Sequence, residues 1–401
     1  MRMMKSFLIA IGAVMGVALI FVGTFYWKNL RGLGPAIGKP TTDITKVINT
    51  TGMPLTLPTG FSISIFAKDL GKPRVLAFDA HQTLLVSIPE SGTVVALPDA
   101  DHDGIADQAK TVVEGLNKPH GLAFKGADKL YVAETNAVAV YDYDQTTLSA
   151  KNRKKLFDLP SGGNHTTRTL LFADPPENSQ LLISIGSTCN VCVESDPQRA
   201  KILVANADGS DLKEYVKGTR NSVFMTNRPH TSEVWATDNS RDLLGDDIPP
   251  DEVNIIQQGK DYGWPICYGK NVYDPTVDAR GSALNPCLST VPSHIDIQAH
   301  SAPLGLRFSP VDLSWSKEYS NNLFVAFHGS WNRTVPTGYK VVRYVIGEDG
   351  KAGGAQDFIT GWLQDKDAVG RPVDLIFGPD NTLYISDDKA GVIYRVTYTS
   401  S

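Results

Sequence analysis

The feature that most restricts the fold of this chain is an internal repeat of short apolar runs. Each copy has a first apolar run, a turn, a second run that ends in polar residues, and a third run. The copies span residues 74–97, 120–143, 168–206, 221–256, 304–345 and 373–398. Six strand-forming repeats of this kind are typical of a six-bladed β-propeller. Two stacked sandwich domains are the alternative, but they do not explain why six copies have the same order of apolar runs and turns.

The bulk composition agrees with an all-β domain. The 401 residues include 35 Gly and 24 Pro, and the short runs are rich in Val, Ile, Thr and Tyr, which favours strands over helices. We expect the early strand at 60–67 to join the last blade and to close the ring. The formal net charge of −5 is too small to indicate a nucleic-acid partner.

Strand direction predicts where a functional site lies. Neighbouring strands of a blade are antiparallel, so the start of the innermost strand and the end of the second strand lie at the same end. The loops at these two places therefore share one face, which we call the mouth. Polar residues before first strands are His120, Asn164, His165, Arg168, Arg220, Asn221 and Arg371. Those after second strands are Ser187, Asn239, Arg241, Asp242, Asp246, Asp247, His328, Arg333, Lys340, Asp388 and Lys389.

These residue types favour an anionic ligand, one general base and a metal ion. Arg220, Arg333, Lys340 and Arg371 suit a small polyanion, because guanidinium groups form paired hydrogen bonds with carboxylates. Carboxylates and backbone carbonyls within 238–247 are ligands that calcium prefers. A histidine beside an arginine is suited to take a proton where negative charge develops. A structural histidine and plain salt bridges are the alternative interpretation.

A known family shares a series of motifs with this chain. They are NKPHGLAF, GGNHTTRTLLF, GTRNSV, WATDNSRDLLGDDIPPDEVN, YGWPICYG, HGSWNRTVPTGYKVVR and GRPVDLIFGPDNTLYISDDKAGVIYRV. Through these motifs, the chain from about residue 55 to 398 resembles the sorbosone and glucose dehydrogenases, six-bladed propellers that use pyrroloquinoline quinone (PQQ) with calcium. The tryptophan-containing motifs and a cysteine pair resemble the membrane-bound sorbosone dehydrogenase branch most. The resemblance implies oxidation of a sugar, or of a sugar-derived aldehyde or alcohol, with electrons passed to a quinone or cytochrome.

The resemblance also implies a role for each matching residue. His165 matches the base that takes a proton from the sugar hydroxyl while hydride passes to PQQ, and Arg220 matches the arginine that stabilises the reduced quinone oxygen. Residues expected in the cofactor site are His120, Asn164, Arg168, Asn221, Arg333, Lys340, Arg371 and Lys389. Backbone carbonyls of Asn239, Ser240 and Arg241 are expected to ligate calcium.

One position departs from the family pattern. Soluble relatives have an aspartate before the base, where this chain has Asn164. An amide can orient the imidazole of His165 but adds no charge, so we expect a less basic histidine. Two other functions fit the fold: a calcium-dependent hydrolase of lactones or esters, and a binding propeller without catalysis. Such hydrolases surround an axial metal with carboxylates and asparagines, whereas this mouth is richer in arginine and lysine.

The N-terminal segment differs from the rest of the chain. Residues 6–27 form an apolar stretch of 22 residues without a charge. As a helix it would span roughly 33 Å, enough for a bilayer. We therefore predict a transmembrane anchor (or a signal sequence) at 1–30, a linker at 31–54 and the propeller at 55–401, on the periplasmic or extracytoplasmic side. A cleaved signal peptide is the alternative, although no small-residue cleavage site follows.

Four cysteines and one acidic loop remain to be interpreted. Cys189, Cys192, Cys267 and Cys287 all follow the apolar segment, so two disulfides are favoured over a zinc site or a redox-active pair, with the pairing left open. Asp99, Asp101 and Asp103 resemble the start of a calcium loop, but an EF-hand glutamate is missing because Lys110 stands at the twelfth position. This loop is expected on the face opposite the mouth, as a structural ion site or a solvated hairpin.

Overall fold

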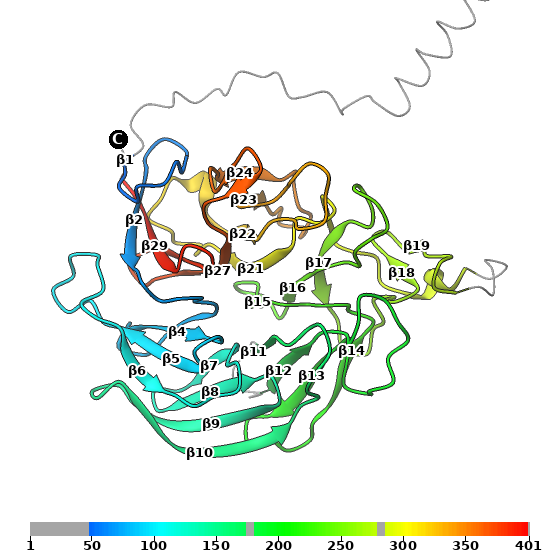
Figure 1. The fold of residues 1–401 in the computed structure, drawn as a ribbon, viewed down its shortest axis with the longest axis horizontal. Helices are drawn as coiled ribbons and strands as arrows, with labels where there is room; N and C mark the ends of the chain where they lie inside the picture. Colours follow the sequence, from blue (N-terminus) through cyan, green and yellow to red (C-terminus); the bar gives the residue numbers. More distant parts are fainter. Residues whose placement is uncertain (1–47, 174–179, 279–284, 400–401) are drawn as a thin grey trace, which may run out of the picture. The chain divides into compact units, whose positions relative to one another are not determined.

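The computed structural model describes residues 48–173, 180–278 and 285–399. These residues form six large sheets around a common axis, antiparallel except for one short parallel pair at the N-terminal edge (Figure 1). The innermost strands, β3, β7, β11, β15, β21 and β27, lie next to one another around that axis. The predicted six-bladed, all-β propeller is therefore confirmed.

Each of the first three blades has four strands. Blade 1 comprises β3 (Leu76–Phe78), β4 (Leu84–Ile88), β5 (Thr93–Leu97) and β6 (Lys110–Val113). Blade 2 comprises β7 (Leu122–Lys125), β8 (Lys129–Glu134), β9 (Ala137–Asp144) and β10 (Ser149–Asp158). Blade 3 comprises β11 (Arg168–Phe172), β12 (Gln180–Ile185), β13 (Lys201–Asn206) and β14 (Lys213–Lys217).

The other three blades carry additional short elements. Blade 4 comprises β15 (Met225–Asn227), β16 (Val234–Asp238), β17 (Asp251–Ile256) and β20 (Ile295–Ile297). Blade 5 comprises β21 (Pro303–Phe308), β22 (Asn322–Phe327), β23 (Lys340–Val345) and β24 (Gln356–Ile359). Blade 6 comprises β27 (Pro372–Phe377), β28 (Leu383–Asp387), β29 (Val392–Tyr398), β2 (Phe61–Ala67) and β1 (Ile48–Asn49). The additional elements are the pairs β18 (Cys267–Tyr268) with β19 (Val272–Tyr273) and β25 (Leu363–Gln364) with β26 (Asp367–Ala368), and the 3₁₀ helices η4 (Pro286–Ser289) and η5 (Lys317–Tyr319).

The N-terminal strand closes the ring as expected. β2 pairs antiparallel with β29 from the C-terminus, with Phe61 opposite Tyr398. The Phe61 side chain is fully buried and has edge-on contacts with the rings of Trp315, Tyr319 and Phe358. Burial of an aromatic ring is a large apolar contribution, so this contact joins the two ends of the domain through the core between blades 5 and 6.

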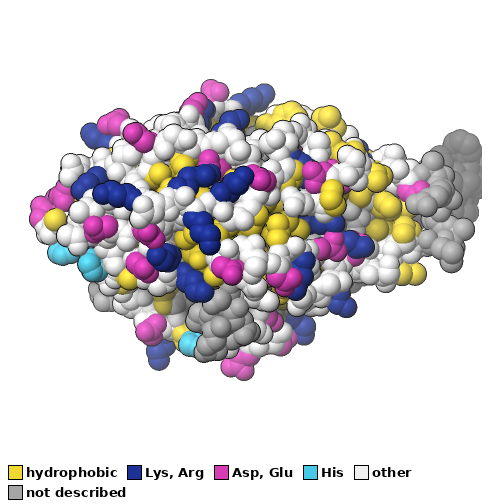
Figure 2. All heavy atoms as spheres, turned by 90° about the horizontal axis from the view of Figure 1, so that it is seen from below, with side chains coloured by type: hydrophobic (Ala, Val, Ile, Leu, Met, Phe, Trp, Pro, Cys, Tyr) yellow, Lys and Arg dark blue, Asp and Glu magenta, His cyan; other side chains and the backbone are white. Residues whose placement is uncertain are grey.

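The outermost strands face water and are charged. Figure 2 views the propeller from the side on which β10 lies, and it shows lysine and arginine side chains gathered there. β10 contributes Lys151, Arg153, Lys154 and Lys155, all exposed. Charged side chains on an edge strand prevent pairing with another sheet. We therefore assign this basic strip a protective role.

The predicted membrane anchor at 1–30 lies outside the described residues, so it stays a prediction. Within 48–173, 180–278 and 285–399, no helix is long and apolar enough to cross a bilayer.

Candidate functional site

Hydrogen bonds between blades bring the polar loops together at the mouth. Ser187, which follows β12, donates from its backbone nitrogen to the Arg220 carbonyl at 2.8 Å, ahead of β15. Arg74, ahead of β3, forms an ion pair with Asp388 after β28 at 2.7 Å. Arg371, ahead of β27, donates from Nε to the His328 carbonyl after β22 at 3.0 Å. The loops before first strands and after second strands thus share one face.

His165 is held with one ring nitrogen engaged. Its Nδ1 lies 2.8 Å from the Ser187 carbonyl and 3.0 Å from Ser187 Oγ. A carbonyl only accepts, and Ser187 Oγ donates to the Cys189 carbonyl at 2.7 Å, so Nδ1 carries the proton. Nε2 is then the unprotonated nitrogen, which is the state a general base requires. Gly186 leaves room for this ring, because a Cβ there would lie 2.7 Å from the His165 Cβ.

The surroundings of His165 make it a weak base. Burial, followed by the positive charge of Arg220, lowers its pKa to about 4. This agrees with the expected loss of basicity, but the orienting contact differs from our expectation. The Asn164 side chain is exposed and has no hydrogen bond with the imidazole among the described residues. Ser187 orients the ring instead.

Arg220 is buried and held on several sides. Its Nε donates to the Asn190 carbonyl at 2.9 Å, its Nη2 to Asn190 Oδ1 at 2.9 Å, and its Nη1 to the Asn239 carbonyl at 2.8 Å. Asp242 lies 3.4 Å from Nη2. Asp238 fixes the backbone here, because its carboxylate accepts from the amides of Arg220 and Asn221. The guanidinium is therefore fixed before any ligand arrives.

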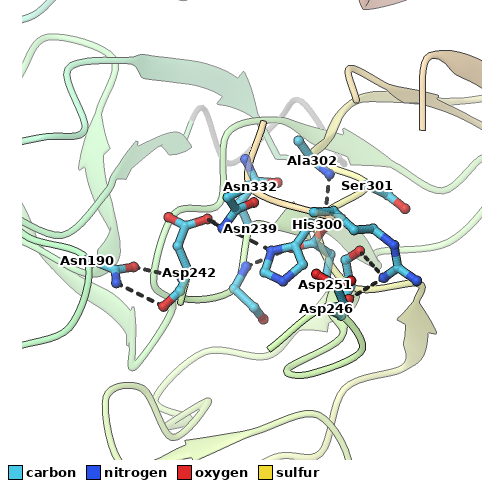
Figure 3. Close-up of polar contacts among 12 residues, drawn as sticks. Asn190, Asn239, Asp242, Asp246, Asp251, His300, Ser301, Ala302 and Asn332 are labelled. Carbon is cyan, nitrogen blue, oxygen red and sulfur yellow. Dashed lines mark hydrogen bonds and ion pairs between the residues drawn. The ribbon is translucent and has the colours of Figure 1, made fainter. Parts of the chain in front are cut away.

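Asp242 contacts several polar residues besides Arg220, and Figure 3 shows it between Asn190 and His300. Asn190 lies on one side of it, and Asn332 donates to its Oδ1 at 3.0 Å. His300 Nδ1 lies 3.9 Å from the same oxygen, and its Nε2 lies 2.7 Å from the Gly245 carbonyl. Loops of blades 3, 4 and 5 are thus joined through one carboxylate.

A second charged group lies on the blade 6 side of the mouth. His328 Nε2 is 2.8 Å from Asp388 Oδ1, while Arg74 contacts the other carboxylate oxygen. Burial lowers the pKa of His328 to about 4, despite the neighbouring carboxylate. Burial alone would raise the pKa of Asp388, but His328 and Arg74 outweigh it and lower that pKa. The group therefore contains one ion pair, Arg74–Asp388, and hydrogen bonds of Asp388 to His328 and of Arg371 to the His328 carbonyl complete this network.

A cavity of about 290 Å³ opens beside this network. Its lining is Lys72, Arg74, Pro89, Glu90, Lys118, His120, Thr166, Thr167 and Asp388. Nε2 of His120 is buried there and has no hydrogen-bond partner among the described residues. Burial, with the nearby charge of Arg74, lowers the His120 pKa well below its ordinary value, so this nitrogen is an unprotonated acceptor or, as the other tautomer, a donor. The lining holds three cations and two carboxylates, and Lys72 pairs with Glu90 at 2.9 Å and Arg74 with Asp388 at 2.7 Å. Lys118 has no ion pair among the described residues, so it is the cation of this lining that an anionic group can reach directly.

Several residues expected in the cofactor site face other partners. Arg168 is fully buried and donates to the carbonyls of Thr167 and Pro160, both at 2.7 Å, so it holds the loop backbone. Lys340 forms an ion pair with Asp357 at 2.6 Å. Arg333 forms an ion pair with Asp247 and donates to the Asp246 carbonyl. Lys389 is exposed, and only its backbone amide has a hydrogen bond among the described residues, to Asp387 Oδ1.

The proposed calcium ligands lie next to Arg220. The carbonyl of Asn239 accepts from that arginine, while Asn239 Oδ1 is buried without a partner among the residues described. The Arg241 side chain turns to Asp274, with Nη1 2.5 Å from Oδ2. The buried, unpaired amide oxygen of Asn239 is a suitable calcium ligand, whereas the Asn239 carbonyl is already engaged by Arg220.

The cysteines form two disulfides, Cys189–Cys192 and Cys267–Cys287. This confirms the preference for disulfides over zinc and settles the pairing. On the opposite face, the loop between β5 and β6 carries Asp99, Asp101 and Asp103 close together. Their carboxylates accept from backbone amides of the same loop, as in a hydrogen-bonded turn.

Sequence reasoning missed four residues at the mouth. Arg74 and Lys118 lie before first strands, as His120 does, so the rule that predicted the other mouth residues applies to them as well. His300 also lies before a first strand, that of blade 5, so the same rule applies to it, whereas Asn190 carried no such signal. Asn190 lies inside an insertion and His300 before the first strand of blade 5, and their contacts with Arg220 and Asp242 join separate blades.

The sequence of this chain is similar to that of one protein family and of several known proteins. A family model described as TrAA12-like matches residues 55–399. An uncharacterised protein of Borreliella burgdorferi is 32% identical over 361 residues, covering 86% of this chain and 91% of that protein. The pyrroloquinoline quinone-dependent pyranose dehydrogenase of Coprinopsis cinerea is 25% identical over 84% of this chain, which matches only 54% of that enzyme's length.

Solved structures share the fold. The calcium structure of a Trichoderma reesei member of Carbohydrate-Active Enzymes Family AA12 has a TM-score of 0.75 and 24% identity, covering 89% of this chain and 100% of that one. The holo form of the PQQ domain of the Coprinopsis cinerea pyranose dehydrogenase has a TM-score of 0.74 and 23% identity, covering 87% of this chain and all 100% of that domain.

Proposed function

Since the chain belongs to the TrAA12-like family, we propose that it is a PQQ-dependent oxidoreductase that oxidises a sugar. The pyranose dehydrogenase of Coprinopsis cinerea supports this assignment. The observation that carries it in this chain is the mouth itself, where an unprotonated histidine nitrogen, a fixed arginine and a cation-lined cavity occur on one face.

The residues at the mouth suit this cofactor. Lys118 would hold a carboxylate, together with Arg74 and Lys72, which pair with Asp388 and Glu90 in the unloaded chain. His120 would offer its free ring nitrogen. Arg371 completes the positive side of the mouth. When bound, PQQ would supply a quinone that accepts a hydride, which carries both electrons of the oxidation. We propose calcium as its partner ion, ligated by carbonyls of Asn239, Ser240 and Arg241 and by Asn239 Oδ1.

Within this proposal, His165 takes the proton from the substrate hydroxyl at Nε2. Its lowered pKa keeps it unprotonated at neutral pH, so the base is ready without a prior proton transfer. Arg220 keeps a positive charge beside it, which favours developing negative charge on the substrate side. Asn221 lies next to Arg220 with its backbone fixed by Asp238.

The finer assignments are also proposals. The substrate is an aldose, a pyranose or a sorbosone-type aldehyde, and electrons leave to a membrane quinone or a small cytochrome. The two disulfides support an extracytoplasmic location, because disulfides persist in oxidising compartments. The apolar stretch at 6–27 supports membrane anchoring.

Cofactor uptake and dye reduction test the function. The chain from about residue 50 onward is mixed with PQQ and calcium, and reduction of a dye is followed with a panel of sugars. We expect uptake of PQQ and turnover with at least one sugar. His165→Ala should still bind PQQ but lose at least about 100-fold in kcat, as expected for loss of a general base. Absence of PQQ uptake would eliminate this function, and uptake without turnover on any sugar would favour a binding propeller.

A further inference from the structure

The loop after β12 contains a four-residue ring that contacts both proposed catalytic residues. The ring is closed by the Cys189–Cys192 disulfide. Its first carbonyl, that of Cys189, accepts from Ser187 Oγ at 2.7 Å. Ser187 in turn accepts from His165 Nδ1 through its carbonyl and its hydroxyl. His165 is therefore linked to the disulfide ring through a single residue, Ser187.

Asn190, inside the same ring, contacts Arg220 more extensively. Its carbonyl and its Oδ1 both accept from the guanidinium, each at 2.9 Å. The side chain is itself held by Asp242, whose backbone nitrogen donates to Oδ1 at 2.7 Å and whose carbonyl accepts from Nδ2 at 3.0 Å. Figure 3 shows these contacts between Asn190 and Asp242. One residue thus fixes the plane of the guanidinium through backbone and side chain.

We propose that Asn190 is a positioning residue for Arg220, and that the Cys189–Cys192 disulfide holds it in place so that opening this disulfide lowers turnover. The part that concerns turnover rests on the proposed function. A displacement of about 1 Å in a group that acts on the reacting atoms can lower a rate about 100-fold. Opening the ring would give the Asn190 backbone more freedom, and because its carbonyl and side chain are two of the acceptors of Arg220, the guanidinium could then shift.

The two disulfides of the chain differ in exposure to solvent, so a reductant should open one of them before the other. Cys189 and Cys192 are half-buried, next to the exposed Val193. Cys267 and Cys287 are buried, at 5% and 0% exposure. A dithiol reductant reaches the first pair first. It gives two electrons and two protons to the Cys189–Cys192 disulfide, which becomes two thiols, while the reductant becomes a disulfide.

The first test compares variants by the pKa of His165, which needs neither cofactor nor substrate. The pKa is read from NMR titration of the imidazole in the unloaded chain. Burial and, after it, the charge of Arg220 lower this pKa in the native arrangement. In Asn190→Ala, and in Cys189→Ser combined with Cys192→Ser, Arg220 is less constrained, so the His165 pKa should rise toward the ordinary value of about 6.5.

The second test uses the enzyme loaded with PQQ and calcium. Asn190→Ala, the Cys189/Cys192 double serine variant and wild type treated with dithiothreitol should each lose about tenfold or more in kcat, with a smaller change in KM. The matched control is the double variant Cys267→Ser, Cys287→Ser, which should melt at a lower temperature but keep the His165 pKa.

The outcomes separate this inference from the proposed function. If wild type shows no sugar oxidation, the proposed function fails, and the NMR titration still decides whether Asn190 positions Arg220. A His165 pKa that is the same in wild type, Asn190→Ala and the dithiothreitol-treated chain would overturn the inference. Treating wild type with reductant avoids any dependence on how well a variant folds.

Discussion

At the residue scale, His165 combines two properties that are set by its neighbours. Ser187 fixes the tautomer, because its carbonyl requires a proton on Nδ1. Burial and the charge of Arg220 then keep Nε2 unprotonated down to low pH. The sequence placed His165 at the mouth through its position before a first strand. It did not point to Ser187 as the orienting residue, because that contact joins the loops of two strands.

The pH dependence of kcat/KM follows from this arrangement. A base is active when it is unprotonated, so activity should be lost as pH falls through the pKa of His165, which is about 4. We expect the acidic limb of the profile close to that value, well below the ordinary histidine value of about 6.5. The measurement is the pH profile of dye reduction at limiting sugar. A limb at pH 6.5 would mean that burial and Arg220 do not act on the base as described.

Arg74 and Lys118 illustrate what residue-level prediction can and cannot find. Both occupy loops before first strands, so strand phase alone places them at the mouth. Arg168 occupies a comparable place, yet its side chain is buried under the loop and binds carbonyls. The position of a residue in the repeat predicts the face of the propeller on which it lies. The direction of its side chain depends on packing, which the repeat pattern does not describe.

At the element scale, the closure of the propeller ring by β2 was predictable from the sequence. The aromatic core around β2 was not. The early strand had no partner within its own repeat, so pairing with the last blade was the remaining choice. The aromatic contacts of Phe61 with Trp315, Tyr319 and Phe358 depend on how blades 5 and 6 face each other. Nothing in the spacing of these rings indicates that they meet.

Phe61→Ala should therefore destabilise the whole domain. Removal of a fully buried aromatic side chain costs about 3–5 kcal/mol in free energy of unfolding, since a cavity replaces its contacts. The measurement is urea unfolding followed by tryptophan fluorescence. Leu288→Ala is the matched control, because that side chain is 81% exposed and its removal should change stability by less than about 0.5 kcal/mol. Equal effects of the two substitutions would contradict closure of the ring by β2.

At the scale of the whole molecule, six blades place loops from distant parts of the sequence on one face. Arg74 and Asp388 are separated by 314 positions and form an ion pair at 2.7 Å. The fold and the face were predictable from the repeat and from strand direction. The cavity beside His120 was not, because its shape depends on side chains from four blades, including the ion pair between Arg74 and Asp388.

The central claim is that PQQ binds at this mouth, between the cation-lined cavity and His165. A crystal structure of the chain with PQQ and calcium tests it most directly. We expect the quinone in contact with His120 and with Arg74 or Lys118, and Nε2 of His165 facing it. PQQ bound at any other surface, or His165 turned away from it, would contradict the account.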